Sequence, residues 1–112
     1  MYKTDEKNYD CAVEALSNIL GKKWVGQIIW NLRNDTKRFG ELQRDLDGCS
    51  KKMLTQQLEI LIKNKIVLND KKEINNIVES TYYLSESGKT LLEVIEGMMR
   101  WSTLNLECKK DN

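Results

Sequence analysis

The sequence contains no histidine and no proline, and it has only three cysteines in 112 residues. Without histidine, the chain lacks the commonest zinc ligand and the commonest general base, which argues against zinc sites and Ser-His catalysis. Cys11, Cys49 and Cys108 lie too far apart for the spacing of metal-binding cysteines. No paired carboxylates, phosphate-binding loop or nucleophile-base combination is visible either. We therefore expect no metal, no cofactor and no enzymatic activity.

Long apolar runs are also missing. No segment approaches the roughly 20 consecutive apolar residues of a membrane-spanning helix, and no hydrophobic stretch follows a basic N-terminus. We therefore expect no membrane partner and a cytoplasmic location. The length suits a single domain with a modest core, covering residues 1–112.

The formal net charge is only +1, so a surface for a polyanion has to come from uneven distribution of charge. Residues 33–65 carry eight basic and five acidic side chains, whereas residues 1–20 carry two basic and four acidic ones. This mild asymmetry favours an anionic partner near the middle of the chain.

Residues 39–64 have the pattern of two helices joined by a tight turn. Phe39 and Leu42 lie on one face of the first helix, at helical spacing. Gly48 ends that helix, since glycine adopts the left-handed backbone found at helix ends, and Ser50 is a candidate N-cap for a longer second helix. The segment predicts a helix-turn-helix, although an ordinary corner between two helices has the same pattern.

The second helix is amphipathic, with an apolar stripe opposite a polar, partly basic one. The apolar stripe holds Leu54, Leu58, Leu61 and Ile62; the polar side holds Lys52, Gln56, Glu59 and Lys63, with Lys51 and Thr55 at its edges. Such a helix is typical of the recognition helix of a DNA-binding domain.

A strand-loop-strand is expected over about residues 66–84. Ile66-Val67-Leu68 and Ser80–Leu84 are rich in β-forming residues, while Asn69–Glu73 and Asn75-Asn76 have the composition of turns. A hairpin directly after a recognition helix is the wing of a winged helix-turn-helix. The predicted fold class is therefore mainly α with a small β-hairpin, with Lys71 and Lys72 at the tip of the wing.

Helices are expected on both sides of this unit. We predict one over Cys11–Leu20, one from Trp24 to about Asn34, and a long final helix over about residues 86–106, capped by Ser85. Met1–Tyr9 is expected to be a loose polar arm. The apolar stripe of the final helix exceeds what a small domain covers, so we expect a homodimer through the terminal helices; packing on the chain's own core is the alternative. The interface candidates are Leu16, Leu91, Ile95, Met98, Met99, Trp101 and Ser102.

The order and spacing of these segments resemble the HxlR-type family of bacterial winged-helix transcriptional regulators, relatives of the MarR group. The resemblance covers about residues 11–102 and is carried by Cys11, Gly21–Trp24, Arg38–Leu42, Gly48–Thr55, Leu58, Leu61, Tyr82–Gly88 and Trp101. The chain departs from the family at Ala12, usually proline, at Lys65, commonly glycine, and at Asn69, commonly arginine. These departures bear on the contacts of the wing rather than on the fold.

The resemblance implies a homodimer that binds double-stranded DNA at a two-fold-related operator, with recognition helices about 34 Å apart in successive major grooves. Gln56 suits the edge of adenine, Lys52 that of guanine, and the Thr55 methyl group that of thymine. The DNA-binding candidates are Arg38, Ser50, Lys51, Lys52, Thr55, Gln56, Lys71 and Lys72. For Lys52 and Gln56, a merely solvated helix face is the alternative; for Arg38, it is an ion pair with Glu41 or Asp45.

In some HxlR-type regulators, the cysteine matching Cys11 senses oxidants or electrophiles, so the resemblance makes Cys11 a candidate redox sensor. The alternative is a semi-buried structural cysteine. Core burial is expected for Cys49, and no role is expected for Cys108. Two further interpretations stay open: a winged helix that contacts a protein partner without reading DNA, and a site for a small apolar effector between the Trp24 and Trp101 helices.

Overall fold

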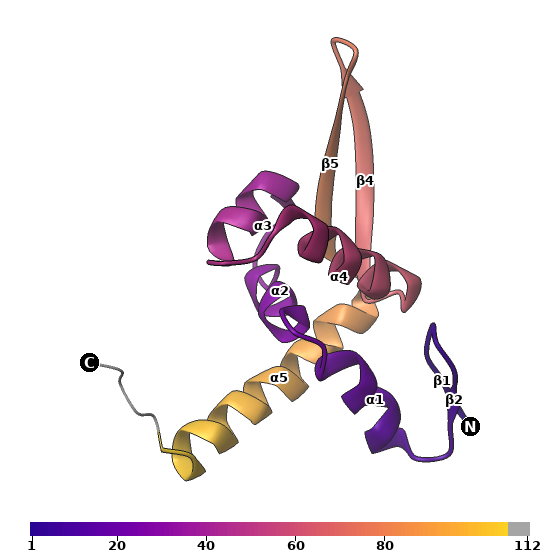
Figure 1. The fold of residues 1–112 in the computed structure, drawn as a ribbon, viewed down its shortest axis with the longest axis vertical. Helices are drawn as coiled ribbons and strands as arrows, with labels where there is room; N and C mark the ends of the chain where they lie inside the picture. The colour runs from indigo at the N-terminus through magenta and orange to yellow at the C-terminus, as the bar shows by residue number, and fades with distance from the viewer. Residues whose placement is uncertain (108–112) are drawn as a thin grey trace.

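Five helices and five strands are present in the computed structural model, which describes residues 1–107 (Figure 1). In order they are β1 (Tyr2–Lys3), β2 (Asn8–Tyr9), α1 (Ala12–Leu20), α2 (Val25–Asn31), β3 (Lys37–Arg38), α3 (Phe39–Asp45), α4 (Lys51–Lys63), β4 (Val67–Ile74), β5 (Ile77–Leu84) and α5 (Glu86–Asn105). The predicted class, a mainly helical winged helix-turn-helix with a small sheet, is confirmed. Among the described helices, none combines the length and apolar character needed to cross a bilayer.

The core lies where α2, α3 and α4 meet. The largest side chains that are fully buried come from these helices and from β4: Val25, Ile28, Ile29, Leu42, Leu54, Leu58, Leu61 and Val67. The apolar stripe predicted for α4 therefore faces inward, and its polar side is left in solvent. Gln57 is also buried, although it lies in a polar stretch of the sequence.

Local chemistry sets the ends of α3 and α4. Ser50 Oγ accepts a hydrogen bond from the Met53 backbone N–H at 3.1 Å, which confirms the predicted N-cap. Helix α3 ends earlier than predicted, at Asp45 with Leu46 as its C-cap, and Gly48 lies in the turn that follows, with a left-handed φ of 87° at which a side chain would be strained. The helix α2 is shorter than predicted, because Trp24 itself has a left-handed φ of 76° and cannot be part of the helix, and because Leu32 caps its other end.

The wing is a regular antiparallel hairpin that projects away from the helices (Figure 1). Strand β4 pairs with β5 from Val67 opposite Leu84 to Ile74 opposite Ile77, and the short β3 pairs with the other edge of β5. Asn75 and Asn76 form the tip, with φ of 52° and 63°, as a type I′ turn requires.

Two predictions about extended segments were wrong. Lys71 and Lys72 do not lie at the wing tip, because β4 continues through them and pairs them with Ser80 and Glu79. The N-terminal arm is not loose. Strands β1 and β2 form a hairpin, and Asp5 and Asn64 tie it to the end of α4 through hydrogen bonds of 3.0 and 2.8 Å.

Helix α5 is anchored at its start and free at its end. Ser85 Oγ accepts from the Gly88 backbone N–H at 3.0 Å and donates to the Lys65 carbonyl at 2.6 Å, which confirms the predicted cap. The first half of α5 packs against the core through Leu91, Leu92 and Ile95. Its second half runs out beyond the helices of the core (Figure 1).

Candidate nucleic-acid interface

The solvent side of α4 carries five of the predicted DNA-binding residues. Ser50, Lys51, Lys52, Thr55 and Gln56 are all exposed. The Thr55 hydroxyl donates to the Lys51 carbonyl at 2.8 Å. That hydrogen bond occupies the hydroxyl proton, so the Thr55 hydroxyl can only accept from a partner, while its methyl group can make apolar contacts.

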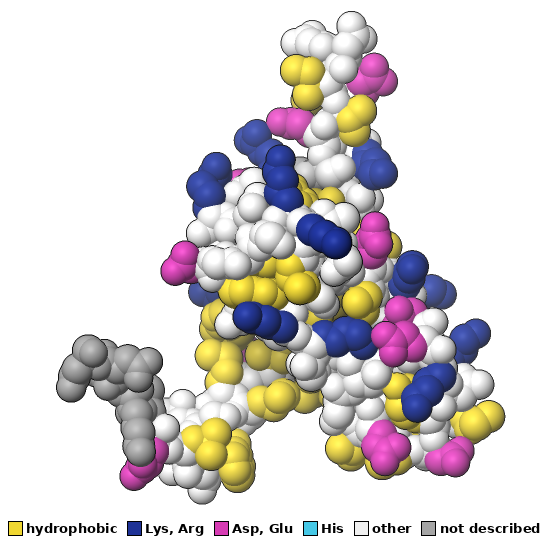
Figure 2. Space-filling model, viewed as in Figure 1, with side chains coloured by type: hydrophobic (Ala, Val, Ile, Leu, Met, Phe, Trp, Pro, Cys, Tyr) yellow, Lys and Arg dark blue, Asp and Glu magenta, His cyan; other side chains and the backbone are white. Residues whose placement is uncertain are grey.

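Positive side chains gather on this side of the molecule. Lysine and arginine side chains lie over α4 and over the turn between α1 and α2 on the face turned to the viewer (Figure 2). Within residues 1–107, neither Lys51 nor Lys52 forms an ion pair. Their charges are therefore available to an anionic partner.

Arg38 is committed to the wing rather than free. Its Nη1 lies 3.1 Å from Glu79 Oε1, and its Nε lies 3.8 Å from Glu41 Oε1. The alternative that paired Arg38 with Asp45 was wrong, because Asp45 pairs with Lys37 at 2.6 Å. The sequence carries no local signal for the Glu79 contact, since the two residues meet only when β5 folds back beside β3.

The wing presents its two lysines to opposite sides. Successive residues of a strand point to opposite faces of the sheet, so Lys71 and Lys72 lie on different faces of the wing and cannot both contact the same DNA groove. Beyond them the wing becomes acidic and apolar: Glu73 is followed by exposed Ile74, Ile77 and Val78, the last two 66% and 64% exposed.

The outer half of α5 has an exposed apolar surface. Met98 is 51%, Trp101 60% and Leu104 78% exposed. Leu16, Leu91 and Ser102 are half-buried and Met99 is exposed, whereas Ile95 is only 7% exposed. Ile95 is thus a core residue of its own chain and offers little surface to a partner.

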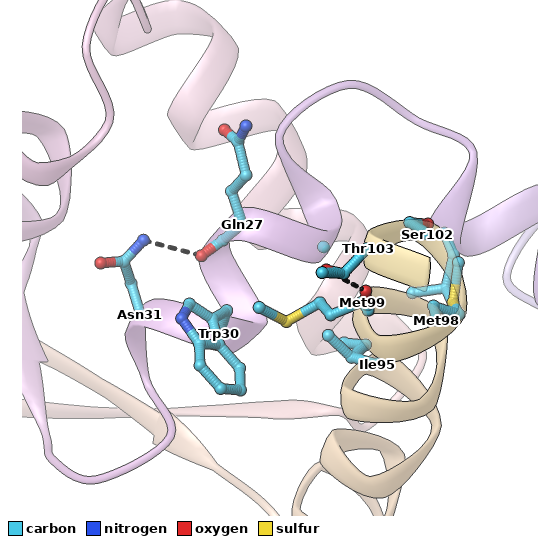
Figure 3. Close-up of a pocket in the computed structure, with 10 residues that line it drawn as sticks. Gln27, Trp30, Asn31, Ile95, Met98, Met99, Ser102 and Thr103 are labelled. Atoms are coloured by element: carbon cyan, nitrogen blue, oxygen red, sulfur yellow. Dashed lines mark hydrogen bonds between the residues drawn. The ribbon is translucent and has the colours of Figure 1, made fainter. Parts of the chain in front are cut away.

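A pocket of about 520 Å³ lies between α2 and the outer half of α5. Trp30 of α2 faces Ile95, Met98 and Met99 of α5, with Asn31 at the rim (Figure 3). The two helices are those expected to enclose an apolar ligand, but Trp30 lines the pocket and neither Trp24 nor Trp101 does.

The two cysteines in the described part of the chain have different surroundings. Cys11 is exposed, at the N-cap position of α1, so a semi-buried structural role does not describe it. Cys49 is 6% exposed; burial raises the pKa of its thiol, and the positive charge of Lys23 partly opposes this. Cys108 lies outside the described residues. Within residues 1–107, no cluster of three or more potential metal ligands occurs.

A capped, exposed, basic second helix followed by a two-stranded wing defines the winged helix-turn-helix class. The family model for the HxlR-like helix-turn-helix matches residues 19–110, and the chain belongs to this family of transcriptional regulators.

Three comparisons illustrate the relationship. The uncharacterized HTH-type transcriptional regulator YtcD of Bacillus subtilis is 36% identical over 101 residues, covering 87% of this chain and 76% of YtcD. The reduced form of the transcriptional regulator YodB from B. subtilis superposes with a TM-score of 0.79 at 32% identity, covering 91% of this chain and 100% of that structure. The redox regulator HypR in its oxidized form superposes with a TM-score of 0.78 at 30% identity, covering 88% of this chain and 100% of that structure.

Proposed function

We propose that this protein regulates transcription by binding double-stranded DNA as a homodimer, at an operator with two-fold symmetry. The observation that carries the proposal is the solvent side of α4, where Lys51, Lys52, Thr55 and Gln56 are exposed together behind the Ser50 cap. A helix of this kind fits the major groove, whose width admits one helix. The family relationship supports the same activity.

The roles follow from the chemistry of each side chain. Gln56 can pair with the adenine edge through two hydrogen bonds, Lys52 can donate to guanine, and the Thr55 methyl group can contact a thymine methyl. Lys51 and the backbone N–H groups after Ser50 are suited to phosphate, since both carry positive character. Arg38 is 62% exposed and can add a phosphate contact, although its ion pair with Glu79 offsets part of its charge.

The proposed dimer rests on the outer half of α5. Met98, Trp101 and Leu104 are large apolar side chains, each more than half exposed, on the same half of α5. A second hollow, lined by Val13, Leu16 and Met98, continues this surface onto α1. A second copy of the chain would cover both parts and set two α4 helices in successive grooves.

A selection from genomic DNA tests the function. Purified protein is incubated with sheared genomic duplexes at stated salt, and the bound fragments are sequenced. The proposal expects one enriched motif with two inverted halves whose centres lie about one helical turn apart. Recovery of no motif, or of a single half-site only, would count against a dimeric DNA-binding protein.

A second candidate function is a response to oxidants through Cys11. Its exposure supports this, and YodB and HypR, both similar to this chain, have structures described as diamide-treated and oxidized. Diamide would take two hydrogens from two Cys11 thiols as a disulfide forms between protomers. Intact-mass measurement and DNA titration before and after mild diamide test it. A disulfide at Cys11 that leaves DNA affinity unchanged would reject sensing.

The distal wing favours one further candidate, a contact with a protein partner. Its exposed Ile74, Ile77 and Val78 lie among acidic residues, which suit a protein surface better than phosphates. Replacing Ile77 and Val78 by threonine keeps β-propensity and removes apolar surface. If DNA affinity falls in these variants, the distal wing belongs to the DNA contact instead.

A further inference from the structure

Lys23 and Lys63 lie along a groove that borders the recognition helix. The groove has a volume of about 510 Å³ and runs between the α1–α2 turn and α4. Its lining also includes Met53, Gln56 and Ile60, so it opens directly beside a residue proposed to contact bases. Neither Lys23 nor Lys63 was singled out as a DNA-binding residue from the sequence.

Lys23 is held in place by an aromatic platform. Its Nζ lies 5.2 Å from the centre of the Trp24 ring, within the range of a cation–π contact. The same ring lies beside the turn of the helix-turn-helix, since a Cβ added to Gly48 would be 4.0 Å from Trp24 Cη2. This contact places the exposed ammonium group of Lys23 near the turn that precedes α4.

The groove keeps a net positive charge. Lys22, its third lysine, is neutralised by Glu6 at 3.2 Å and hydrogen-bonded to Asn18. Within residues 1–107, Lys23 and Lys63 form no ion pair, and Glu59 is the acidic residue among those that line the groove.

The balance of charge differs between the two sides of α4. Apart from Lys22, which pairs with Glu6, the α1–α2 turn and α4 together carry Lys23, Lys51, Lys52 and Lys63 against Glu59. Residues 67–84 of the wing carry two basic and three acidic side chains. Phosphates are therefore attracted toward the α1–α2 side more than toward the distal wing.

We propose that this groove receives the sugar–phosphate backbone of the DNA strand that flanks the base pairs contacted by α4, with Lys23 and Lys63 binding its phosphates. Met53 and Ile60 give the floor an apolar surface that suits deoxyribose. The inference rests on the proposed DNA-binding function and adds a second region of backbone contact to it.

The salt dependence of binding to a mixed-sequence duplex of about three helical turns tests the proposal. Each phosphate contact contributes about 0.9 to the slope of log K against log salt concentration. The double variant Lys23→Gln, Lys63→Gln should lower this slope by about 2 and weaken binding by about tenfold or more at low salt. Glutamine preserves much of the side-chain length, and thermal unfolding checks that the fold is retained.

The matched control is Arg33→Gln, Lys89→Gln, which removes the same charge from the segment after α2 and from α5, where Lys89 pairs with Glu86; Arg33 and Lys89 both line a hollow away from α4. The proposal expects its slope to equal that of the unaltered protein. An equal fall in both double variants, or an unchanged slope in the groove variant, would overturn it. If the unaltered protein binds no duplex at all, the proposed function itself fails, and this inference fails with it.

Discussion

Arg38 and Glu79 join the strand before the helix-turn-helix to the wing. Their side chains are 3.1 Å apart although 41 positions separate them in the sequence. Both lie on one face of the sheet, because Arg38 is opposite Thr81 and Glu79 is two residues away on β5. Lys72 is opposite Glu79 on β4, but within residues 1–107 the ion pair of Glu79 is with Arg38 and not with Lys72.

Replacing Glu79 by glutamine should release Arg38. The pair is solvent-exposed, so the free energy of unfolding should change by less than about 1 kcal/mol. DNA affinity should rise, because one acidic charge is lost and the Arg38 guanidinium becomes available to phosphate. Urea unfolding and DNA titration measure the two effects. Glu86→Gln makes the same charge change on α5 and should leave DNA affinity as it was; a similar rise in both variants would refute a specific role for Arg38.

Substitution by alanine should have opposite effects on the free energy of unfolding at two glycines of α5. A Cβ on Gly88 would lie 2.3 Å from the Ile66 carbonyl oxygen and 3.2 Å from the Leu84 side chain, so Gly88→Ala should destabilise the fold by about 1–3 kcal/mol. Nothing lies within 4 Å of a Cβ on Gly97, and Gly97→Ala should stabilise by about 0.5–1 kcal/mol. The midpoints of urea unfolding of the two variants, each compared with the unaltered protein, measure these effects. Equal effects would mean that α5 does not contact Ile66 as described.

The buried thiol of Cys49 should make stability depend on alkaline pH. Burial raises the pKa of Cys49 above its ordinary value, so the folded state holds the proton more tightly than the unfolded chain. This contribution is complete below the unfolded pKa, about 8.5, and is lost as the pH rises through the higher folded value. Burial also raises the pKa of Tyr82, which acts in the same direction near its own ordinary value of about 10.

The test compares unfolding free energies of the unaltered protein and Cys49→Ala between about pH 8 and about pH 10. The variant should lose less stability over this interval. Cys11→Ala, at an exposed position, is the control and should keep the full decline. Identical declines in all three proteins would exclude a contribution from Cys49.

A charge on the outer half of α5 should prevent association of two copies. Met98 is half exposed, so Met98→Glu should leave the monomer folded while it places a carboxylate in the proposed interface. Sedimentation should show a shift from dimer to monomer. Thr90→Glu adds the same charge at an exposed position in the first half of α5, away from the proposed interface, and should stay dimeric. If the Met98→Glu protein is still dimeric, the dimer interface does not include the outer half of α5.

The features that sequence predicted well depend on neighbouring residues. Ser50, Ser85 and Gly48 act within one helical turn of themselves, so cap and turn chemistry located both helix starts and the turn. The buried stripe of α4 follows from spacing alone. The extent of the wing does not, because the Lys71 and Lys72 segment is polar enough for a loop and becomes strand only through pairing with Ser80 and Glu79.

The features that sequence missed depend on distant partners. Strand β3 exists because β5 returns beside it, and the N-terminal hairpin is tied down by Asn64, far along the chain. The left-handed Trp24 and its contact with the Gly48 turn likewise join segments that sequence patterns treat separately. Lys23 and Lys63 come to line one groove only because the α1–α2 turn packs beside α4, so the sequence near Lys23 gives no sign of this groove.

The polar side of α4 is proposed to contact base edges, and gel-shift titration of Lys52→Ala and Gln56→Ala measures the loss of two of these contacts. The titration uses the duplex recovered in the genomic selection and a scrambled duplex of equal length. We predict that Gln56→Ala loses affinity for the selected duplex only, by about 1–3 kcal/mol, and so narrows the difference between the two duplexes. Lys52→Ala should also reduce the difference in affinity between the two duplexes, because Lys52 is proposed to donate to guanine. Unaltered affinity of both variants for both duplexes would show that neither Lys52 nor Gln56 contacts the bases.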